Sequence, residues 1–196
     1  MTLLEGPVPG ATEVTVWTLE QLSRSELMPA RAPRCAVELV EVRARTPELN
    51  RFLYTAVGGD WYWVDRLTWT YAQWSAWVDR PEHRTLVAQV GGAPAGYAEL
   101  EEQPGGEVEL AYFGLLPRFT GLGLGGWLLE QALRAAWATP GTRRVWVHTC
   151  SLDGPAALAN YQARGLTVVA QTLEYRDLSA TTPGPWPGAD RPAPER

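Results

Sequence analysis

The stretch Glu107–Trp137 constrains the fold of this chain most, because three local patterns follow one another there without a break. Alternating polar and apolar residues predict a strand that ends before Pro117. Four glycines within Gly121–Gly126 predict a turn, and apolar residues at helical spacing from Leu124 to Ala136 predict a helix. A glycine-rich turn at a helix start exposes unpaired backbone N–H groups, which bind phosphate groups well. The stretch therefore predicts a binding site for a phosphate-bearing cofactor.

The patterns on either side of this stretch predict an α/β fold. Strands are expected at residues 13–19, 37–43, 84–90, 94–101, 107–116, 143–150 and 166–173. Helices are expected at residues 47–57, 70–79, 124–137 and 152–164. Because three of the strands follow one another through short turns, we expect a mixed, mostly antiparallel sheet with helices on both faces.

The length of 196 residues suits one domain with a core of its own. We place this domain at residues 13–178, after a loosely ordered N-terminus at residues 1–12. Residues 179–196 are rich in proline and lack an apolar period, so we expect a disordered tail there. The N-terminus lacks the basic segment of a signal peptide, and no apolar run is long enough to span a membrane. We therefore expect a cytoplasmic protein without a membrane partner.

Composition removes several function classes. The net charge of −5 argues against a nucleic-acid partner. All 17 residues in the Lys and Arg total are arginine, and the missing lysine excludes a Walker A phosphate loop. Cys35 and Cys150 lie far apart and form no metal-ligand pattern, so we expect no metal site.

Two cofactors compete for the glycine turn. Gly121, Gly123 and Gly126 satisfy the G-x-G-x-x-G pattern of dinucleotide-binding proteins. That pattern normally follows the first, fully buried strand of a parallel sheet, whereas the strand here is the fifth and alternates with glutamate. Coenzyme A is the second candidate, and it enters through a resemblance to a known family.

A resemblance to a known family favours coenzyme A. The segment Leu115–Leu129 resembles the acetyl-CoA signature of the GCN5-related N-acetyltransferases, in which a bulged strand ends at a proline and a Q/R-x-x-G-x-G/A loop opens a helix. Arg118–Gly123 matches the letters of that loop, but Thr120–Gly125 better matches its distances, and we prefer the second alignment. Ala156–Leu166 resembles a second motif of the family, A-x-x-x-Y-x-x-x-G-F, with Leu166 in place of the aromatic residue. The resemblance covers about residues 84–173.

The resemblance implies an acetyl-CoA-dependent N-acetyltransferase and indicates how the cofactor binds. Backbone N–H groups from Thr120 to Gly126 would bind the pyrophosphate, and the pantetheine arm would pair with the strand near Phe113–Leu115. The expected cofactor-binding residues are Phe113, Leu115, Thr120, Gly121, Leu122, Gly123, Leu124, Gly125, Gly126 and Asn160.

Direct transfer of the acetyl group to an amine needs an acid for the leaving thiolate and a base for the amine. Tyr161 matches the position of the family's usual acid. For the base the sequence offers Glu109, then Glu107, then His148, and a carboxylate at Glu109 can act through a water molecule. Glu107 is also typical of a solvated hairpin, and His148 of a structural histidine. An acyl-cysteine route through Cys150 needs an activating partner that the sequence does not identify.

The sequence gives the fewest indications of where the amine acceptor binds. Trp61, Tyr62 and Trp63 follow a Gly-Gly pair in a loop, where rings often line pockets, so we expect them to form the acceptor wall. The implied partner is a small-molecule or peptide amine, and a homodimer is compatible with the sequence. A non-catalytic acyl-CoA-binding module on the same fold is the main alternative, followed by a dinucleotide-binding oxidoreductase.

Overall fold

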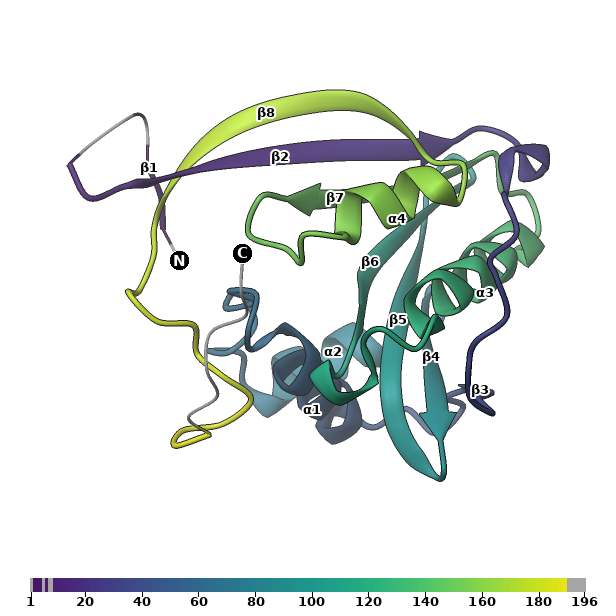
Figure 1. Cartoon of the computed structure of the whole chain (residues 1–196), viewed down its shortest axis with the longest axis horizontal. Coiled ribbons are helices and arrows are strands. Elements are labelled where there is room, and N and C mark those ends of the chain that lie inside the picture. The colour runs from purple at the N-terminus through teal and green to yellow at the C-terminus, as the bar shows by residue number, and fades with distance from the viewer. Residues whose placement is uncertain (1, 5, 7–8, 190–196) are drawn as a thin grey trace.

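The computed structural model describes residues 2–4, 6 and 9–189, and its centre is an eight-stranded sheet in the order β1-β8-β2-β7-β6-β5-β4-β3 (Figure 1). The strands are β1 (Thr2–Leu4), β2 (Thr12–Gln21), β3 (Glu38–Glu41), β4 (His83–Val90), β5 (Ala93–Gln103), β6 (Glu107–Leu115), β7 (Arg144–Cys150) and β8 (Thr167–Asp177). The helices are α1 (Pro47–Gly58), α2 (Tyr71–Val78), α3 (Leu124–Ala138) and α4 (Ala157–Ala163), with short 3-10 turns at Arg24–Glu26 and Pro117–Phe119. Only β6 and β7 pair in parallel among these strands, which confirms the mixed, mostly antiparallel sheet.

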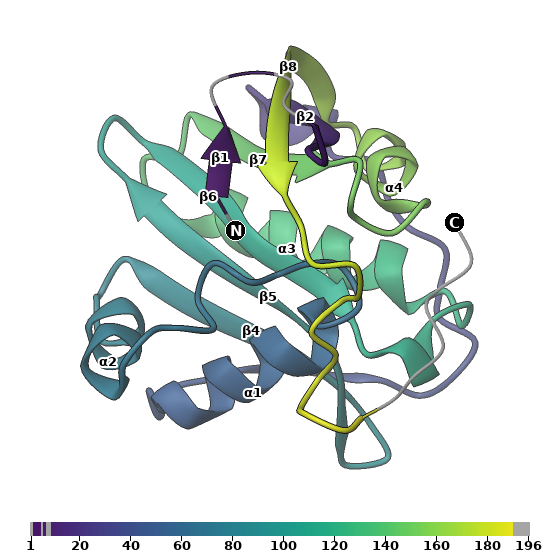
Figure 2. The same ribbon diagram turned by 90° about the vertical axis from the view of Figure 1, so that its left-hand side faces the viewer.

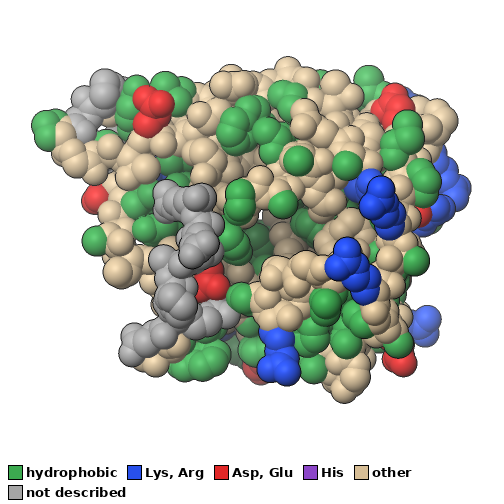
Figure 3. Space-filling model, in the orientation of Figure 1, with side chains coloured by type: hydrophobic (Ala, Val, Ile, Leu, Met, Phe, Trp, Pro, Cys, Tyr) green, Lys and Arg blue, Asp and Glu red, His purple; other side chains and the backbone are tan. Residues whose placement is uncertain are grey.

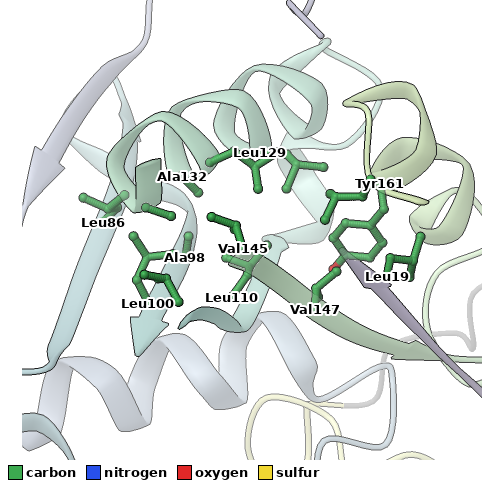
Figure 4. Packing of buried hydrophobic residues seen from close by; sticks show 14 residues of the cluster. Leu19, Leu86, Ala98, Leu100, Leu110, Leu129, Ala132, Val145, Val147 and Tyr161 are labelled. Atoms are coloured by element: carbon green, nitrogen blue, oxygen red, sulfur yellow. The ribbon is translucent and has the colours of Figure 1, made fainter. Parts of the chain in front are cut away.

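Helices cover both faces of the sheet, as the sequence predicts (Figure 2). On one face, the apolar stripe of α3 packs with Leu100, Val108 and Leu110 of the sheet, and Figure 4 shows part of this core. On the other face, α1 buries Leu53 and Val57 against β4 and β5 in a second core. None of the helices in the described part of the chain is long and apolar enough to cross a membrane.

A β-bulge at Ala111 reverses the alternation of β6. Leu100 of β5 pairs with Leu110, but the preceding Glu99 pairs with Tyr112, so Ala111 is an extra residue in β6. Leu110 therefore belongs to the core under α3, and Phe113 also packs against that core, although their spacing in a regular strand would place them on opposite faces. The bulge turns the end of β6 towards the glycine loop.

The pairing between β6 and β7 is short. It joins Glu107 to Arg144, Val108 to Val145 and Glu109 to Trp146, and then the two strands separate (Figure 1). β7 continues beside β2, whereas β6 continues beside β5. The sheet therefore opens between the second halves of β6 and β7, and both strands present unpaired backbone groups to the opening.

Both ends of the chain differ from the sequence expectation where they are described. Thr2–Leu4 is not loosely ordered, because it pairs with Tyr175–Asp177 at the end of β8. Residues 179–189 have no helix or strand, but the N–H of Gly184 donates to the carbonyl of Gly59 at 3.0 Å. This stretch therefore lies against the end of α1, and residues 190–196 of the expected disordered tail lie outside the described part.

The remaining differences concern element boundaries. The helix expected at residues 152–164 is the shorter α4, because residues 151–154 form a turn after β7. In that turn, Asp153 accepts hydrogen bonds from the hydroxyl of Thr149 (2.6 Å) and the N–H of Cys150 (3.1 Å), and so holds the end of β7. β3 is shorter than expected, and all four of its residues are exposed, as suits an edge strand.

Gly165, which follows the C-cap residue of α4, has a left-handed conformation with φ +90° and is closely surrounded. A Cβ atom there would lie 1.9 Å from the carbonyl oxygen of Glu26. Gly92 has a similar φ of +80°, but a Cβ atom there would meet no described atom within 4 Å. Substituting each glycine in turn therefore distinguishes the cost of backbone strain from the cost of a steric clash.

We predict that Gly165→Ala lowers the free energy of unfolding by about 3–5 kcal/mol, because strain and a backbone clash add. Gly92→Ala carries the strain alone and should cost about 1–2 kcal/mol. Urea denaturation of both variants measures the two values. Equal losses in the two variants would contradict the close packing of α4 on the segment at Glu26.

Candidate functional site

A cleft of about 730 Å³ occupies the opening between β6 and β7. Residues of β6, β7, the glycine loop, α4 and the aromatic loop after α1 line it. Figure 3 shows the molecule hollowed near the centre of the view, with hydrophobic side chains around the hollow. The elements that the sequence singled out thus meet at one place, although they are distant in the chain.

The glycine loop forms one end of the cleft. Gly121 and Gly123 have φ values of +78° and +79°, which only glycine adopts without strain. A Cβ atom at Gly121 would meet no described atom within 4 Å, so the backbone there is open to a ligand. Gly123 is the N-cap residue of α3, and no side chain in the described part of the chain caps this helix start. The first N–H groups of α3 are therefore available to an anion.

The predicted cofactor residues contribute to this end in different ways. Thr120 lines the cleft, but its hydroxyl donates to the carbonyl of Pro117 at 2.8 Å and so stabilises the loop. Leu122 and Leu124 do not line the cleft. The carbonyl of Leu122 accepts the N–H of Arg34 at 3.0 Å, and the side chain of Leu124 is fully buried. The remaining predicted residues that line the cleft are Phe113, Leu115, Gly121, Gly123, Gly125, Gly126 and Asn160.

Glycine at residues 125 and 126 keeps the start of α3 close to its neighbours. A Cβ atom at Gly125 would lie 3.7 Å from Leu115 Cδ1 and 3.8 Å from Asn160 Nδ2. A Cβ atom at Gly126 would lie 3.4 Å from Arg164 Nη1 and 3.5 Å from Asn160 Oδ1. Small residues here leave a narrow groove between β6, α3 and α4, which suits an extended chain ending in a phosphate group.

Arg34 is a residue of this groove that the sequence did not single out. It lies in a connector between β2 and β3 that has no repeating pattern, so only the folded structure brings it to the cleft. The connector is held on α3 by the bond from Arg34 to Leu122 and by the N–H of Ala30, which donates to Glu130 Oε2 at 2.7 Å. A guanidinium beside the glycine loop adds a positive charge for a phosphate group.

Tyr161 of α4 lines the cleft and packs against Phe113 of β6. Its ring centroid is 6.0 Å from that of Phe113, and Figure 4 shows the ring beside Leu19 and Val147. The side chain is buried, and this burial raises the pKa of Tyr161 above its ordinary value, with further contributions from Asp153 and Cys150. The hydroxyl therefore keeps its proton and can act as a donor.

His148 and Glu109 form a pair on neighbouring strands just where the sheet opens. His148 lines the cleft and has an exposed side chain, whereas Glu109 is buried behind it. His148 Nδ1 lies 3.2 Å from Glu109 Oε1, and Gln103 Nε2 donates to Glu109 Oε2 at 2.8 Å. The bond to Glu109 raises the pKa of His148. Nδ1 facing the carboxylate leaves Nε2 free to accept a proton.

Two other candidates for the chemistry have different surroundings. Glu107 accepts a hydrogen bond from Arg144 at 2.8 Å and does not line the cleft, so it is a surface ion pair. Cys150 lines the cleft, but burial raises the pKa of its thiol to about 11, with a contribution from Asp153. A thiol with that pKa is a poor nucleophile near neutral pH, which argues against an acyl-cysteine route.

The aromatic loop forms the other end of the cleft. Trp61, Tyr62 and Trp63 all line it, together with Tyr54 of α1 and Tyr112 of β6. The ring of Trp63 lies 5.7 Å from Tyr54 and 5.0 Å from Tyr112, between centroids. The structure places all three loop residues at the cleft. Tyr112 of β6 extends the same wall, and the fully buried Tyr54 packs against it.

A buried ionic network supports this wall from behind. Glu99 is fully buried and accepts hydrogen bonds from Asn50 (2.8 Å), Trp77 (2.8 Å) and Arg66 (3.3 Å). Burial by itself would raise the pKa of Glu99, but its contacts with His83, Arg66 and Asn50 outweigh burial and lower it. The carboxylate therefore stays charged and neutralises Arg66.

Arg66 connects the buried network to the aromatic rings that line the cleft. Its guanidinium carbon lies 4.2 Å from the ring centroid of Tyr112 and 3.7 Å from that of Trp77. Nothing in the sequence marks Glu99 as different from Glu101, because both belong to the same alternating strand. Only the packing of α1 and α2 over one part of β5 buries the first and leaves the second at the rim.

A mixed sheet that opens between two parallel strands, beside a glycine loop at a helix start, defines the class of acyl-CoA N-acyltransferases that the sequence resembles. The family model described as "Acetyltransferase (GNAT) family" matches residues 46–166, more than half of the chain. The chain belongs to this family. Among curated proteins, none matches the sequence.

Solved structures agree with this fold. A GCN5-related N-acetyltransferase from Kribbella flavida is similar with a TM-score of 0.61 and 20% identity, covering 89% of this chain and 61% of that one. A GCN5-related N-acetyltransferase from Sphaerobacter thermophilus has a TM-score of 0.59 and 20% identity, covering 85% and 53%. An aminoglycoside acetyltransferase from an uncultured soil metagenomic sample has a TM-score of 0.54 and 12% identity, covering 65% and 86%. The chain thus spans less than two thirds of the first two structures.

We predict that Glu99→Gln lowers the free energy of unfolding by about 3–5 kcal/mol, because it leaves Arg66 as a buried charge without its partner. Glu101→Gln is the matched control on the same strand, where the partner Arg80 is partly exposed, and it should cost at most about 1 kcal/mol. Thermal and urea denaturation compare the two. A loss for Glu99→Gln no larger than that of the control would contradict the role of the network.

Proposed function

We propose that this protein is an acetyl-CoA-dependent N-acetyltransferase that moves an acetyl group directly to a primary amine of a small molecule or peptide. One observation carries the proposal: the open glycine loop, the free edge of β6, Tyr161 and His148, which contacts the buried Glu109, all border one cleft. The chain's membership of the acetyltransferase family supports it.

The residues at the glycine end suit the cofactor. Backbone N–H groups at the start of α3 would bind the pyrophosphate, and Arg34 would add a charge-assisted contact to a phosphate group. The edge of β6 at Phe113–Leu115 would pair with the amides of the pantetheine arm, because it has no strand partner on the side of β7. Acetyl-CoA, when bound, supplies the thioester carbonyl that the amine attacks.

The chain's own residues move the protons. His148 Nε2 accepts a proton from the amine, and Glu109 holds the imidazole through Nδ1 and stabilises its charged form. Among the candidate bases in the sequence, we therefore propose a pair, with the histidine at the cleft and the carboxylate behind it. Tyr161 holds its proton at the hydroxyl and donates it where the thiolate charge develops.

The experiment that tests the function is release of the coenzyme A thiol from acetyl-CoA in the presence of amines, with thermal shift as a binding assay. We expect coenzyme A to raise Tm, and NAD(H) to leave it unchanged. Amine-dependent thiol release then identifies an acetyltransferase. Binding of coenzyme A without release from any amine would instead indicate a non-catalytic acyl-CoA-binding module, and a rise in Tm with NAD(H) alone would favour a dinucleotide-binding protein.

We predict that Tyr161→Phe lowers kcat by about 100-fold, because the leaving thiolate loses its proton donor. The ring and its packing remain, so the affinity for coenzyme A should not change. Steady-state kinetics and titration calorimetry measure the two quantities, and Tyr71→Phe, on the exposed surface of α2, is the control. An unchanged kcat would exclude Tyr161 as the acid.

A second prediction concerns the acid limb of the pH profile of kcat/KM, which reports the loss of the proton from His148. Glu109 raises the pKa of His148, so Glu109→Gln should lower that pKa and shift the acid limb to lower pH. The plateau should fall by about 10-fold, because the charged imidazole loses its carboxylate. Glu107→Gln, on the same strand but outside the cleft, should leave the limb in place. The same limb in both variants would rule out the pair as the base.

A further inference from the structure

The acceptor end of the cleft is built from aromatic rings that form one continuous surface. Trp63 lies 5.0 Å from Tyr112 between ring centroids, and the fully buried Tyr54 packs against both rings, at 5.7 Å and 5.2 Å. Trp61 extends this surface to the opposite wall, because a Cβ atom at Gly154, in the turn after β7, would lie 3.5 Å from its ring. A ligand at this end would therefore contact ring faces and edges on more than one side.

These rings are held in place before any acceptor binds. Trp63 Nε1 lies 3.5 Å from Asp153 Oδ1, which joins the loop to the turn after β7. The hydroxyl of Tyr62 donates to the carbonyl of Ser179 at 3.0 Å. Tyr62 is also the only described residue other than glycine with a positive φ, at 60°. Such strain is typical of binding sites, and a fixed surface loses little entropy when a ligand binds.

The charged side chains at the aromatic end of the cleft favour a ligand with one positive charge. Asp65 and Asp153 line the cleft, and each lies beside the aromatic wall. Arg176 also lines it, and its guanidinium donates to Glu174 at 2.6 Å and 2.9 Å. Arg66 lies behind Tyr112 and is neutralised by Glu99. Two carboxylates and several ring faces attract an ammonium group, through charge and through cation–π contact.

The same surface offers few partners to a ligand with many hydroxyl groups. Apart from the two aspartates and the tyrosine hydroxyls, the polar side chains that line this end are His148, Thr149, Cys150 and Arg176. Thr149 already donates to Asp153, and the hydroxyl of Tyr62 already donates to the carbonyl of Ser179. Hydroxyl groups placed against the rings would lose water without gaining hydrogen bonds, which costs affinity. A flat apolar group would instead bury its surface against the rings.

We infer that the acceptor is a primary amine carried on a flat, apolar body, such as an arylalkylamine, and that Trp61 and its neighbouring rings bind that body. This inference rests on the proposed acetyltransferase function and specifies its substrate class. The ammonium group would approach the aspartates and lose its proton to His148, while the ring of the acceptor lies against the aromatic wall.

The test compares amines in the thiol-release assay with the full chain and acetyl-CoA. We expect kcat/KM for 2-phenylethylamine and tryptamine to exceed that for ethylamine by about 10- to 100-fold, the gain typical of burying one ring. Kanamycin and spermidine should be poorer than ethylamine. Preference for kanamycin or spermidine would overturn the inference and leave the proposed function intact, whereas no release from any amine would overturn both.

A variant of Trp61 tests whether the aromatic wall produces the preference for aromatic amines. Trp61→Ala should lower kcat/KM for 2-phenylethylamine by about 10-fold, mainly through KM, with a smaller loss for ethylamine. Tyr71→Ala removes an aromatic side chain that is exposed on α2, outside the cleft, and should change neither value. An equal loss for the two amines in Trp61→Ala would show that the ring does not select the acceptor, and would contradict the inference.

Discussion

The early separation of β6 and β7 is the constraint on which the rest of the site depends. Only three residue pairs join the two strands, ending at Glu109 and Trp146. Beyond that point each strand is held from its outer side, β6 by β5 and β7 by β2. The inner edges therefore stay open without unfolding the sheet, and the cleft forms between them.

The residues that could transfer protons lie where β6 and β7 separate. Glu109 ends the pairing, and its carboxylate reaches His148, two residues further along β7 than Trp146. Tyr161 approaches the same opening from α4, and its burial keeps its hydroxyl protonated. The opening thus brings an imidazole and a tyrosine hydroxyl to the border of one cleft, as the proposed transfer requires.

The two ends of the cleft are stabilised by different means. At the glycine end, backbone groups and small residues make the surface, and the connector with Arg34 is tied to α3 by hydrogen bonds. At the aromatic end, rings make the surface, and the buried Glu99–Arg66 pair supports them from behind. The glycine loop and the element order could be predicted from the sequence, because both depend on local spacing. Arg34, the Glu99 network and the Glu109–His148 contact could not, because each joins residues that only the fold brings together.

Hydrogen exchange of the backbone amides with and without coenzyme A tests the central claim most directly, since the claim assigns the cofactor to particular N–H groups. The account predicts that coenzyme A slows exchange in the glycine loop, at Gly121–Gly126, and on the open edge of β6, at Phe113–Leu115. Slowed exchange at another part of the chain, with these two segments unchanged, would contradict it.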